Sequence, residues 1–206
     1  MKITRTGNAG VLVETNEISV LLDGVCKTLF PYSPTPPCIK EQILKSSPDI
    51  VAFTHFHEDH YDEEFAASYK KNTLRSVYGP ELFLRGEYKG VKFSTFSTRH
   101  IGKNQIAHVS FTVEGEKCLW FAGDASPLDL EKQEGLPKPD ILVVPYAYAL
   151  TESAWRKTKA FGAEKIILVH MPEEKIDPYG LWQQVREVTQ GDESLIILSV
   201  GENIVI

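Results

Sequence analysis

The chain has 206 residues, 42% of them hydrophobic and 24% charged, and a formal net charge of -6. These proportions exclude a disordered chain, and the acidic balance leaves no basic face for a nucleic acid. No apolar run is long enough to cross a bilayer and no secretory signal follows Met1, so we expect one domain over residues 1–206, in the cytoplasm and without a membrane partner.

Short apolar segments dominate the first part of the chain and predict strands, because they alternate or run apolar at strand length. Four prolines in residues 31–38 exclude a central strand there and indicate a surface loop that forms one wall of a cleft. Residues 62–72 have acids in the first turn and lysines in the last, as a helix prefers. The other elements predicted here are strands at 9–15, 17–23 and 49–55, the first two as a hairpin, and a helix at 39–47.

The pattern changes along the second part of the chain. Antiparallel strands are predicted at 75–79, 91–97, 107–115 and 117–124, the last two as a hairpin. Strands then alternate with helices: strands at 140–146, 165–171, 194–200 and 202–206, and helices at 151–163 and 177–188, with Thr151 and Asp177 as caps. Helix-covered sheets and a strand-rich first half predict an α/β fold, a four-layer αββα sandwich of two mixed sheets with helices outside.

Three of the six histidines lie in the stretch THFHEDHYDEEF, residues 54–65. His55 and His57 are one residue apart at the end of a predicted strand, so both imidazoles point to the same side and can hold one cation. Asp59 and His60 follow at a turn and can face a second cation. This mixture of nitrogen and oxygen donors suits zinc, iron or manganese better than magnesium or calcium.

The alternative interpretation of this stretch is a solvated acidic loop whose histidines cap the following helix. Three further residues disfavour it: His100, Asp124 and His170 each end a predicted apolar strand. In layered α/β folds, ligands gather where strands give way to loops. We therefore expect these residues to converge on the histidine stretch.

The sequence resembles the metallo-β-lactamase superfamily of metal-dependent hydrolases. The superfamily signature H-x-H-x-D-H stands at residues 55–60 behind a buried strand, and its other positions follow in order as Asp23, His100, Asp124 and His170. The resemblance implies two divalent transition metals. Zinc is the first candidate, and manganese or iron are the alternatives. One metal is expected on His55, His57 and His100 and the other on Asp59, His60 and His170, with Asp124 bridging.

The same resemblance implies a mechanism in which a hydroxide that bridges the metals attacks the substrate. Asp59 and Asp124 are the expected catalytic residues, since both bind metal and Asp59 also orients the attacking water. Asp23 is expected to fix the ligand loop through hydrogen bonds without binding metal. His108 is expected to be a core or supporting residue rather than a ligand.

The expected reaction is hydrolysis of a small ester, lactone, thioester or phosphodiester. The run D-H-Y-D at residues 59–62 is similar to the branch with ascorbate-phosphate lactonases and acyl-ethanolamine hydrolases, although VVPYAYAL replaces that branch's proline and paired glycines. Candidate substrate contacts are Tyr146 and Tyr148, which alternate at a predicted strand end, and Arg99 and Lys103, which flank His100. The alternatives are that the tyrosines pack against a helix and that the charged side chains of Arg99 and Lys103 are merely solvated.

An alternative function is a catalytically silent, metal-stabilised binding or sensor module of the same fold. Redox chemistry of the flavodiiron type is disfavoured by His57, where those proteins have glutamate. Nucleases of the superfamily are disfavoured because the short spacing between motifs leaves no room for their inserted domain. The expected partner is therefore a small-molecule substrate.

Overall fold

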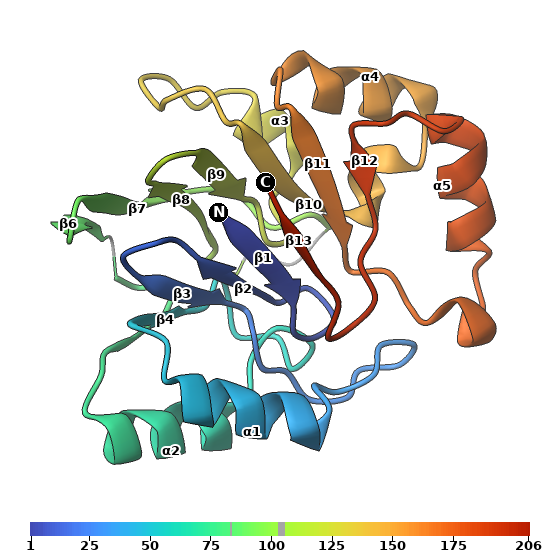
Figure 1. Ribbon diagram of the computed structural model, residues 1–206. Helices are drawn as coiled ribbons and strands as arrows, with labels where there is room; N and C mark the ends of the chain where they lie inside the picture. Colours follow the sequence, from blue (N-terminus) through green and yellow to red (C-terminus); the bar gives the residue numbers. More distant parts are fainter. Residues whose placement is uncertain (83, 103–105) are drawn as a thin grey trace.

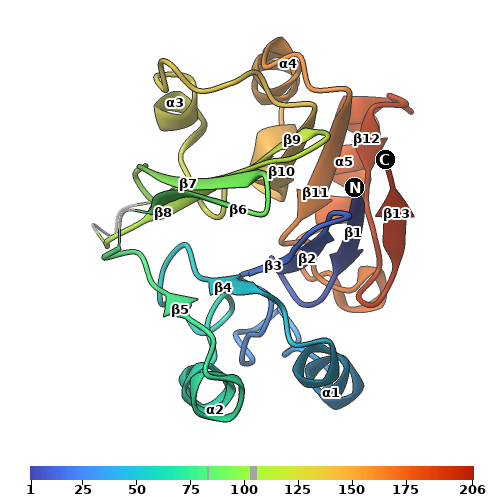
Figure 2. The same cartoon turned by 60° about the vertical axis from the view of Figure 1, so that its left-hand side comes forward.

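The computed structural model describes residues 1–82, 84–102 and 106–206. Two mixed sheets pack face to face, with helices on their outer faces (Figures 1 and 2). The predicted four-layer α/β sandwich is confirmed. Among the described residues, no helix has the length and apolar character needed to cross a membrane.

The first sheet has six strands in the order β13-β1-β2-β3-β4-β5. The hairpin of β2 and β3 is antiparallel, as predicted, whereas β3, β4 and β5 run parallel because helices connect them. The bounds are β1 Lys2–Arg5, β2 Val11–Glu14, β3 Ser19–Leu22, β4 Ile50–Ala52, β5 Val77–Tyr78 and β13 Asn203–Val205, with helices α1 Pro37–Ser46 and α2 Glu63–Thr73.

The second sheet has seven strands in the order β12-β11-β10-β9-β8-β7-β6. Strands β6 to β9 form an antiparallel meander, and β9 to β12 run parallel. The bounds are β6 Arg85–Tyr88, β7 Val91–Ser97, β8 Val109–Glu114, β9 Cys118–Phe121, β10 Ile141–Pro145, β11 Lys165–Val169 and β12 Leu195–Ile196. The helices of this half are α3 Pro127–Leu130, α4 Glu152–Ala160 and α5 Leu181–Thr189, with 3-10 turns η1 Tyr146–Ala149 and η2 Glu174–Ile176.

Alternating side chains divide the core into three layers, because successive residues of a strand face opposite sides of its sheet. Between the two sheets lie residues such as Val13, Phe111 and Val143. On the outer faces, Phe53 packs under α1 and α2, and Trp120 packs under α4 and α5 with their neighbours. The central strands of the two sheets, such as β3, β10 and β11, are buried on both faces and hold the loops at their ends in place.

Several predicted elements need correction. The strands expected at 49–55 and 75–79 are limited to Ile50–Ala52 and Val77–Tyr78. The strand expected at 140–146 ends at Pro145, which has no amide proton for the ladder, and η1 follows. The last long helix starts at Leu181 rather than at 177, because Gly180 takes a left-handed conformation with φ of 65°. The strand expected at 194–200 is limited to Leu195–Ile196.

The sheets bring the ends of several strands to one edge of the sandwich. Asp23 follows β3, residues 53–60 follow β4, Asp124 follows β9 and His170 follows β11. Because β3 and β4 are parallel neighbours, their carboxyl ends open on the same side. The predicted ligands therefore start from adjacent positions.

Candidate metal centre

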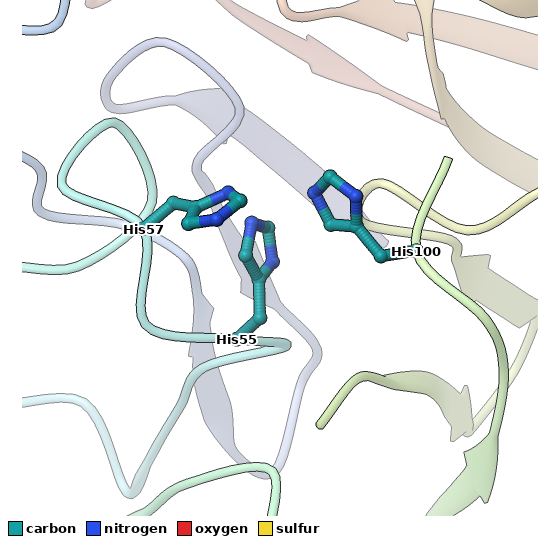
Figure 3. Close-up of side chains that lie close together, drawn as sticks. All are labelled: His55, His57 and His100. Carbon is teal, nitrogen blue, oxygen red and sulfur yellow. The ribbon is translucent and has the colours of Figure 1, made fainter. Parts of the chain in front are cut away.

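Three histidines from two separate loops face one another (Figure 3). His55 and His57 stand on the loop after β4, and His100 stands on the loop after β7. One nitrogen of each lies within 4.8 Å of the others. The structure thus brings together the three residues predicted for the first cation.

The second predicted group is Asp59, His60 and His170, whose ligand atoms also lie within 4.8 Å of one another. His170 Nε2 is 2.9 Å from Asp59 Oδ2. Asp124 lies between the two groups: its Oδ1 is 3.4 Å from His60 Nε2, and its Oδ2 is 3.5 Å from the Nε2 atoms of both His100 and His170. The Asp124 carboxylate therefore reaches donors of both groups.

Asp23 lies beneath the ligand loop and is completely buried. Its Oδ1 accepts a hydrogen bond from the Thr54 amide at 2.7 Å, and its Oδ2 accepts one from the Thr54 hydroxyl at 2.6 Å. The same Oδ2 lies 2.8 Å from His60 Nδ1. Asp23 is thus occupied by the loop it supports, which is the arrangement expected of a residue that orients ligands.

These hydrogen bonds set the tautomers of two histidines. The Thr54 hydroxyl has one proton and gives it to Asp23, so it can only accept from His55 Nδ1, 2.9 Å away. His60 Nδ1 likewise donates to the Asp23 carboxylate. On both rings the proton is on Nδ1, which leaves the Nε2 lone pair free for a cation.

Several ring nitrogens and one carboxylate oxygen at this edge of the sandwich are buried but have no hydrogen-bond partner among the described residues. An unpaired buried polar group costs about 1–3 kcal/mol, so a cluster of them in one place requires an explanation. The unpaired atoms are Nε2 of His55 and His60, both ring nitrogens of His100 and His170, and Oδ1 of Asp124. Nitrogen and carboxylate donors in this arrangement fit transition-metal ions.

Burial keeps two of the imidazoles neutral. Burial lowers the pKa of His55 far below its ordinary value, and repulsion from His60 adds to the effect. Burial also lowers the pKa of His57. A neutral imidazole is the form that binds a metal ion.

The carboxylates stay ionised for a different reason. Burial alone would raise the pKa of Asp124 and of Asp59, but the neighbouring histidines His170 and His60 outweigh it and hold both values below the ordinary range. At His60, burial is in turn outweighed by Asp124 and Asp23, which raise its pKa. A proton therefore competes with a cation for His60.

The N-terminal loop supports the second group in a way the sequence did not reveal. Asn8 accepts a hydrogen bond from the His170 amide at 3.0 Å on its carbonyl, and its side-chain amide donates to Asp59 Oδ2 at 3.3 Å. The buried Arg5 guanidinium donates to the carbonyls of Asn8 and Met171. His170 itself has a positive φ of 61°, which its backbone contacts must maintain.

His108 has both ring nitrogens engaged, so it is not a ligand. Its Nε2 accepts a hydrogen bond from the Asp124 amide at 3.1 Å, and its Nδ1 lies 2.8 Å from the Thr98 hydroxyl. Burial lowers the pKa of His108 to about 3. The supporting role expected for this residue agrees with these contacts.

Three of the four candidate substrate contacts are not seen at the site in the structure. Tyr148 is completely buried and its hydroxyl donates to the Ala125 carbonyl at 2.9 Å, so the prediction that it contacts substrate is wrong. The cause is η1, since a 3-10 turn does not alternate its side chains as a strand does. Arg99 is exposed and its guanidinium is paired with Asp129, and Lys103 lies outside the described residues.

Tyr146 lies close to the candidate metal centre, and so does Tyr32, which was not predicted. The Tyr146 ring centroid is 5.9 Å from that of His170, and the Tyr32 ring meets His170 edge-on at 4.3 Å. Burial raises the pKa of Tyr32, and the neighbouring Tyr146 hydroxyl, Asp124 and Asp59 raise it further. The proline-rich loop was predicted to form a wall of the cleft, but no pattern in the sequence singled out Tyr32.

Comparisons with known proteins identify the family of the chain. A family model described as the beta-lactamase superfamily domain matches residues 2–169. The chain is 25% identical over 173 residues to a UPF0173 metal-dependent hydrolase of Methanobrevibacter smithii, an alignment that covers 70% of each chain.

Two solved structures share the fold. A possible metal-dependent hydrolase from Veillonella parvula has a TM-score of 0.74 at 16% identity, with 100% of this chain and 99% of that chain covered. Igni18, a metallo hydrolase from Ignicoccus hospitalis, has a TM-score of 0.69 at 17% identity, with 98% and 97% covered. At these identities the structures establish the fold alone.

Proposed function

The chain belongs to the beta-lactamase superfamily and is a metal-dependent hydrolase, and from this premise we propose that it hydrolyses a small ester, lactone, thioester or phosphodiester with two bound transition-metal ions. The observation that carries the proposal is the set of unpaired buried donors that meet at Asp124. Zinc is the first candidate metal, with manganese and iron as alternatives. The D-H-Y-D run at 59–62 supports a place near the ascorbate-phosphate lactonase-like branch.

In this proposal His55, His57 and His100 hold one ion, and Asp59, His60 and His170 hold the other. Asp124 serves both, because its two carboxylate oxygens approach donors of both groups. When bound, two such ions supply a hydroxide at neutral pH and polarise the scissile carbonyl or phosphoryl group.

The protein's own groups perform the remaining tasks. Asp59, whose Oδ2 accepts a hydrogen bond from Asn8, is the group that we expect to orient the attacking water and accept its proton. Thr54 and Asp23 keep the protons of His55 and His60 on Nδ1, so that each Nε2 stays a donor of electrons. Burial of these groups strengthens every charge interaction among them.

The first test is metal content together with a ligand variant. Protein purified without chelators is expected to contain about two transition-metal equivalents per chain by inductively coupled plasma mass spectrometry. His57→Ala removes one donor of the first group and is expected to lose metal and hydrolytic activity together. Protein without bound metal under these conditions, even after incubation with zinc, would contradict the proposal.

A panel of generic esters, lactones and bis-aryl phosphodiesters separates catalysis from the alternative function. Turnover by the metal-loaded protein supports the hydrolase. Zero turnover combined with tight binding of one compound would favour a binding or sensor module. His57→Ala is the matched control for background hydrolysis.

A further inference from the structure

Tyr32 is held over the metal centre by a loop that is fixed on both sides. On one side, the Lys27 amide donates to the carbonyl of Glu58 in the ligand loop at 2.7 Å. On the other, the Ser33 hydroxyl donates to Glu173, close behind His170, at 3.0 Å. Leu29 and Tyr32 form an isolated antiparallel bridge between these anchors. The Tyr32 side chain is therefore pre-positioned beside the centre.

The rings of Tyr32 and Tyr146 both lie beside His170, with centroids 4.3 and 5.9 Å from the His170 ring. Both side chains are only half-buried. Within residues 1–82, 84–102 and 106–206, neither hydroxyl donates to a backbone carbonyl, unlike Tyr148, whose hydroxyl donates to Ala125 at 2.9 Å. Two hydroxyl donors are thus available at the side of the centre where His170 stands.

Among the described residues, the arginines near the site are not available to meet an anionic ligand. An anionic phosphodiester is usually met by arginine or lysine. The two arginines nearest in sequence to the site loops are already engaged: Arg5 donates to backbone carbonyls and Arg99 is paired with Asp129. Neutral hydroxyl donors instead match a carbonyl oxygen, which takes up negative charge only during reaction.

We infer that Tyr32 and Tyr146 form a donor pair for the carbonyl oxygen of an uncharged acyl substrate, an ester, lactone or thioester; this rests on the proposed function. Water adds to the carbonyl carbon, and the electron pair of the C=O bond moves to the oxygen, which the tyrosines hydrogen-bond without losing their protons. As the C=O bond forms again, the C–O or C–S bond breaks, and the departing alcohol or thiol takes up the proton that water lost. Atoms and charge balance without any further reactant.

The test compares Tyr32→Phe, Tyr146→Phe and the exposed control Tyr179→Phe. In metal-loaded protein, each of the first two is expected to lower kcat for an aryl ester or thioester by about 100-fold, with metal content and Tm unchanged. Hydrolysis of a bis-aryl phosphodiester should fall far less. Ester activity within twofold of wild type, or an equal loss on the phosphodiester, would overturn the inference.

Binding of an aryl trifluoromethyl ketone, whose hydrate mimics the oxyanion, provides a readout that does not need turnover. Titration calorimetry should show affinity weakened at least tenfold in Tyr32→Phe and unchanged in Tyr179→Phe. Equal affinity of the wild type, Tyr32→Phe and Tyr179→Phe for the ketone would overturn the inference of a donor pair. Loss of metal from the wild-type chain, by contrast, would count against the proposed function itself.

A separate observation concerns a buried hydrogen-bond chain behind Asp124. The Ser110 hydroxyl donates to the Ala122 carbonyl at 2.8 Å, so it can only accept from Thr98, 3.0 Å away. The Thr98 hydroxyl has then given its one proton and must accept from His108 Nδ1. His108 Nε2 is left as the acceptor for the Asp124 amide. Each bond in this chain therefore has one direction.

We propose that His108 is a positioning residue for Asp124, and that Thr98 and Ser110 fix its tautomer. The residue before Asp124 is Gly123, whose φ is 56° and whose added Cβ would lie 2.5 Å from Thr54. The main chain at Asp124 is thus confined by Thr54 on one side and held by His108 on the other. Both contacts set where the shared carboxylate lies.

Nitrogen-detected NMR of the zinc-loaded wild type tests the tautomer directly. The His108 ring is expected to carry its proton on Nδ1, with Nε2 unprotonated and not shifted as a metal ligand. A proton on Nε2 would overturn the proposal. This measurement stands even if a variant does not fold.

Metal affinity tests the positioning role. His108→Gln can keep an acceptor for the Asp124 amide, whereas His108→Phe cannot. Competition with a chromophoric chelator is expected to show about tenfold weaker binding in His108→Phe and in Thr98→Val, with Thr98→Ser near wild type and His108→Gln partly rescued. Wild-type affinity in His108→Phe would contradict the role.

Discussion

Two protons determine which nitrogen atoms of the ligand loop are free. Thr54 and Asp23 hold one proton on Nδ1 of His55 and another on Nδ1 of His60. The signature of the loop predicted the candidate ligands but not this hydrogen-bond network, because Thr54 has no special place in the sequence pattern. Asp23 was predicted to orient the loop, and its contacts agree with that.

Asp23→Asn tests the network at His60. The amide NH₂ would face two donors, Thr54 Oγ1 and His60 Nδ1, so His60 is expected to move its proton to Nε2 and to stop binding metal. We expect the affinity of the group of Asp59, His60 and His170 for zinc to fall about 10- to 100-fold. Titration with a chromophoric chelator should then show fewer than two tight equivalents. Two zinc equivalents bound by Asp23→Asn with wild-type affinity would contradict this account.

At the scale of elements, the ends of the strands were easier to predict than the elements around the substrate. Buried apolar strands and their polar ends gave the positions of His100, Asp124 and His170, since alternation and burial are local signals. Tyr148 was misplaced because Pro145 ends the strand and a 3-10 turn follows. Strand β1 was missed because its four residues become a strand only by pairing with β2 and β13.

Asp49 joins three elements of the first sheet and permits a test of stability against pH. Its carboxylate accepts hydrogen bonds from the Ser19 amide at 2.9 Å and from Arg75 at 2.6 Å. Burial acts to raise the pKa of Asp49, but Ser19 and Arg75 outweigh it, so the pKa in the folded chain is lowered. The stabilisation is therefore present above the unfolded pKa near 3.8 and is lost as pH falls through the lower folded value.

Asp49→Asn is expected to lower the free energy of unfolding by about 1–2 kcal/mol at pH 7, with a difference that shrinks as pH falls below the unfolded pKa near 3.8. Urea unfolding at a series of pH values measures both. Glu17→Gln, at an exposed acid on the neighbouring hairpin, is the control. A difference that is constant with pH would show that the carboxylate charge is not responsible.

For the whole molecule, the layered architecture brings ligands from distant parts of the chain to one edge. The alternation of elements was sufficient to predict the αββα sandwich. The contacts of Tyr32 and His108 were not predictable, because they depend on how loops pack after both sheets have formed. Tertiary contacts of this kind have no local sequence signal.

Metal binding should stabilise the entire fold, because the ligands come from both sheets. At a zinc concentration a hundredfold above Kd, binding to the folded state contributes about 2.7 kcal/mol. In a chain of this size that corresponds to a rise in Tm of about 5–10 °C. Differential scanning calorimetry with and without chelator measures the rise, and His57→Ala should show a smaller one. An unchanged Tm in the wild type would mean that the ions do not bind the folded chain.

The most direct measurement is anomalous diffraction at the zinc edge from crystals of protein loaded with zinc. The account predicts two peaks beside Asp124, one among His55, His57 and His100 and the other among Asp59, His60 and His170. A structure with no peak there, or with these imidazoles turned away from one another, would contradict it.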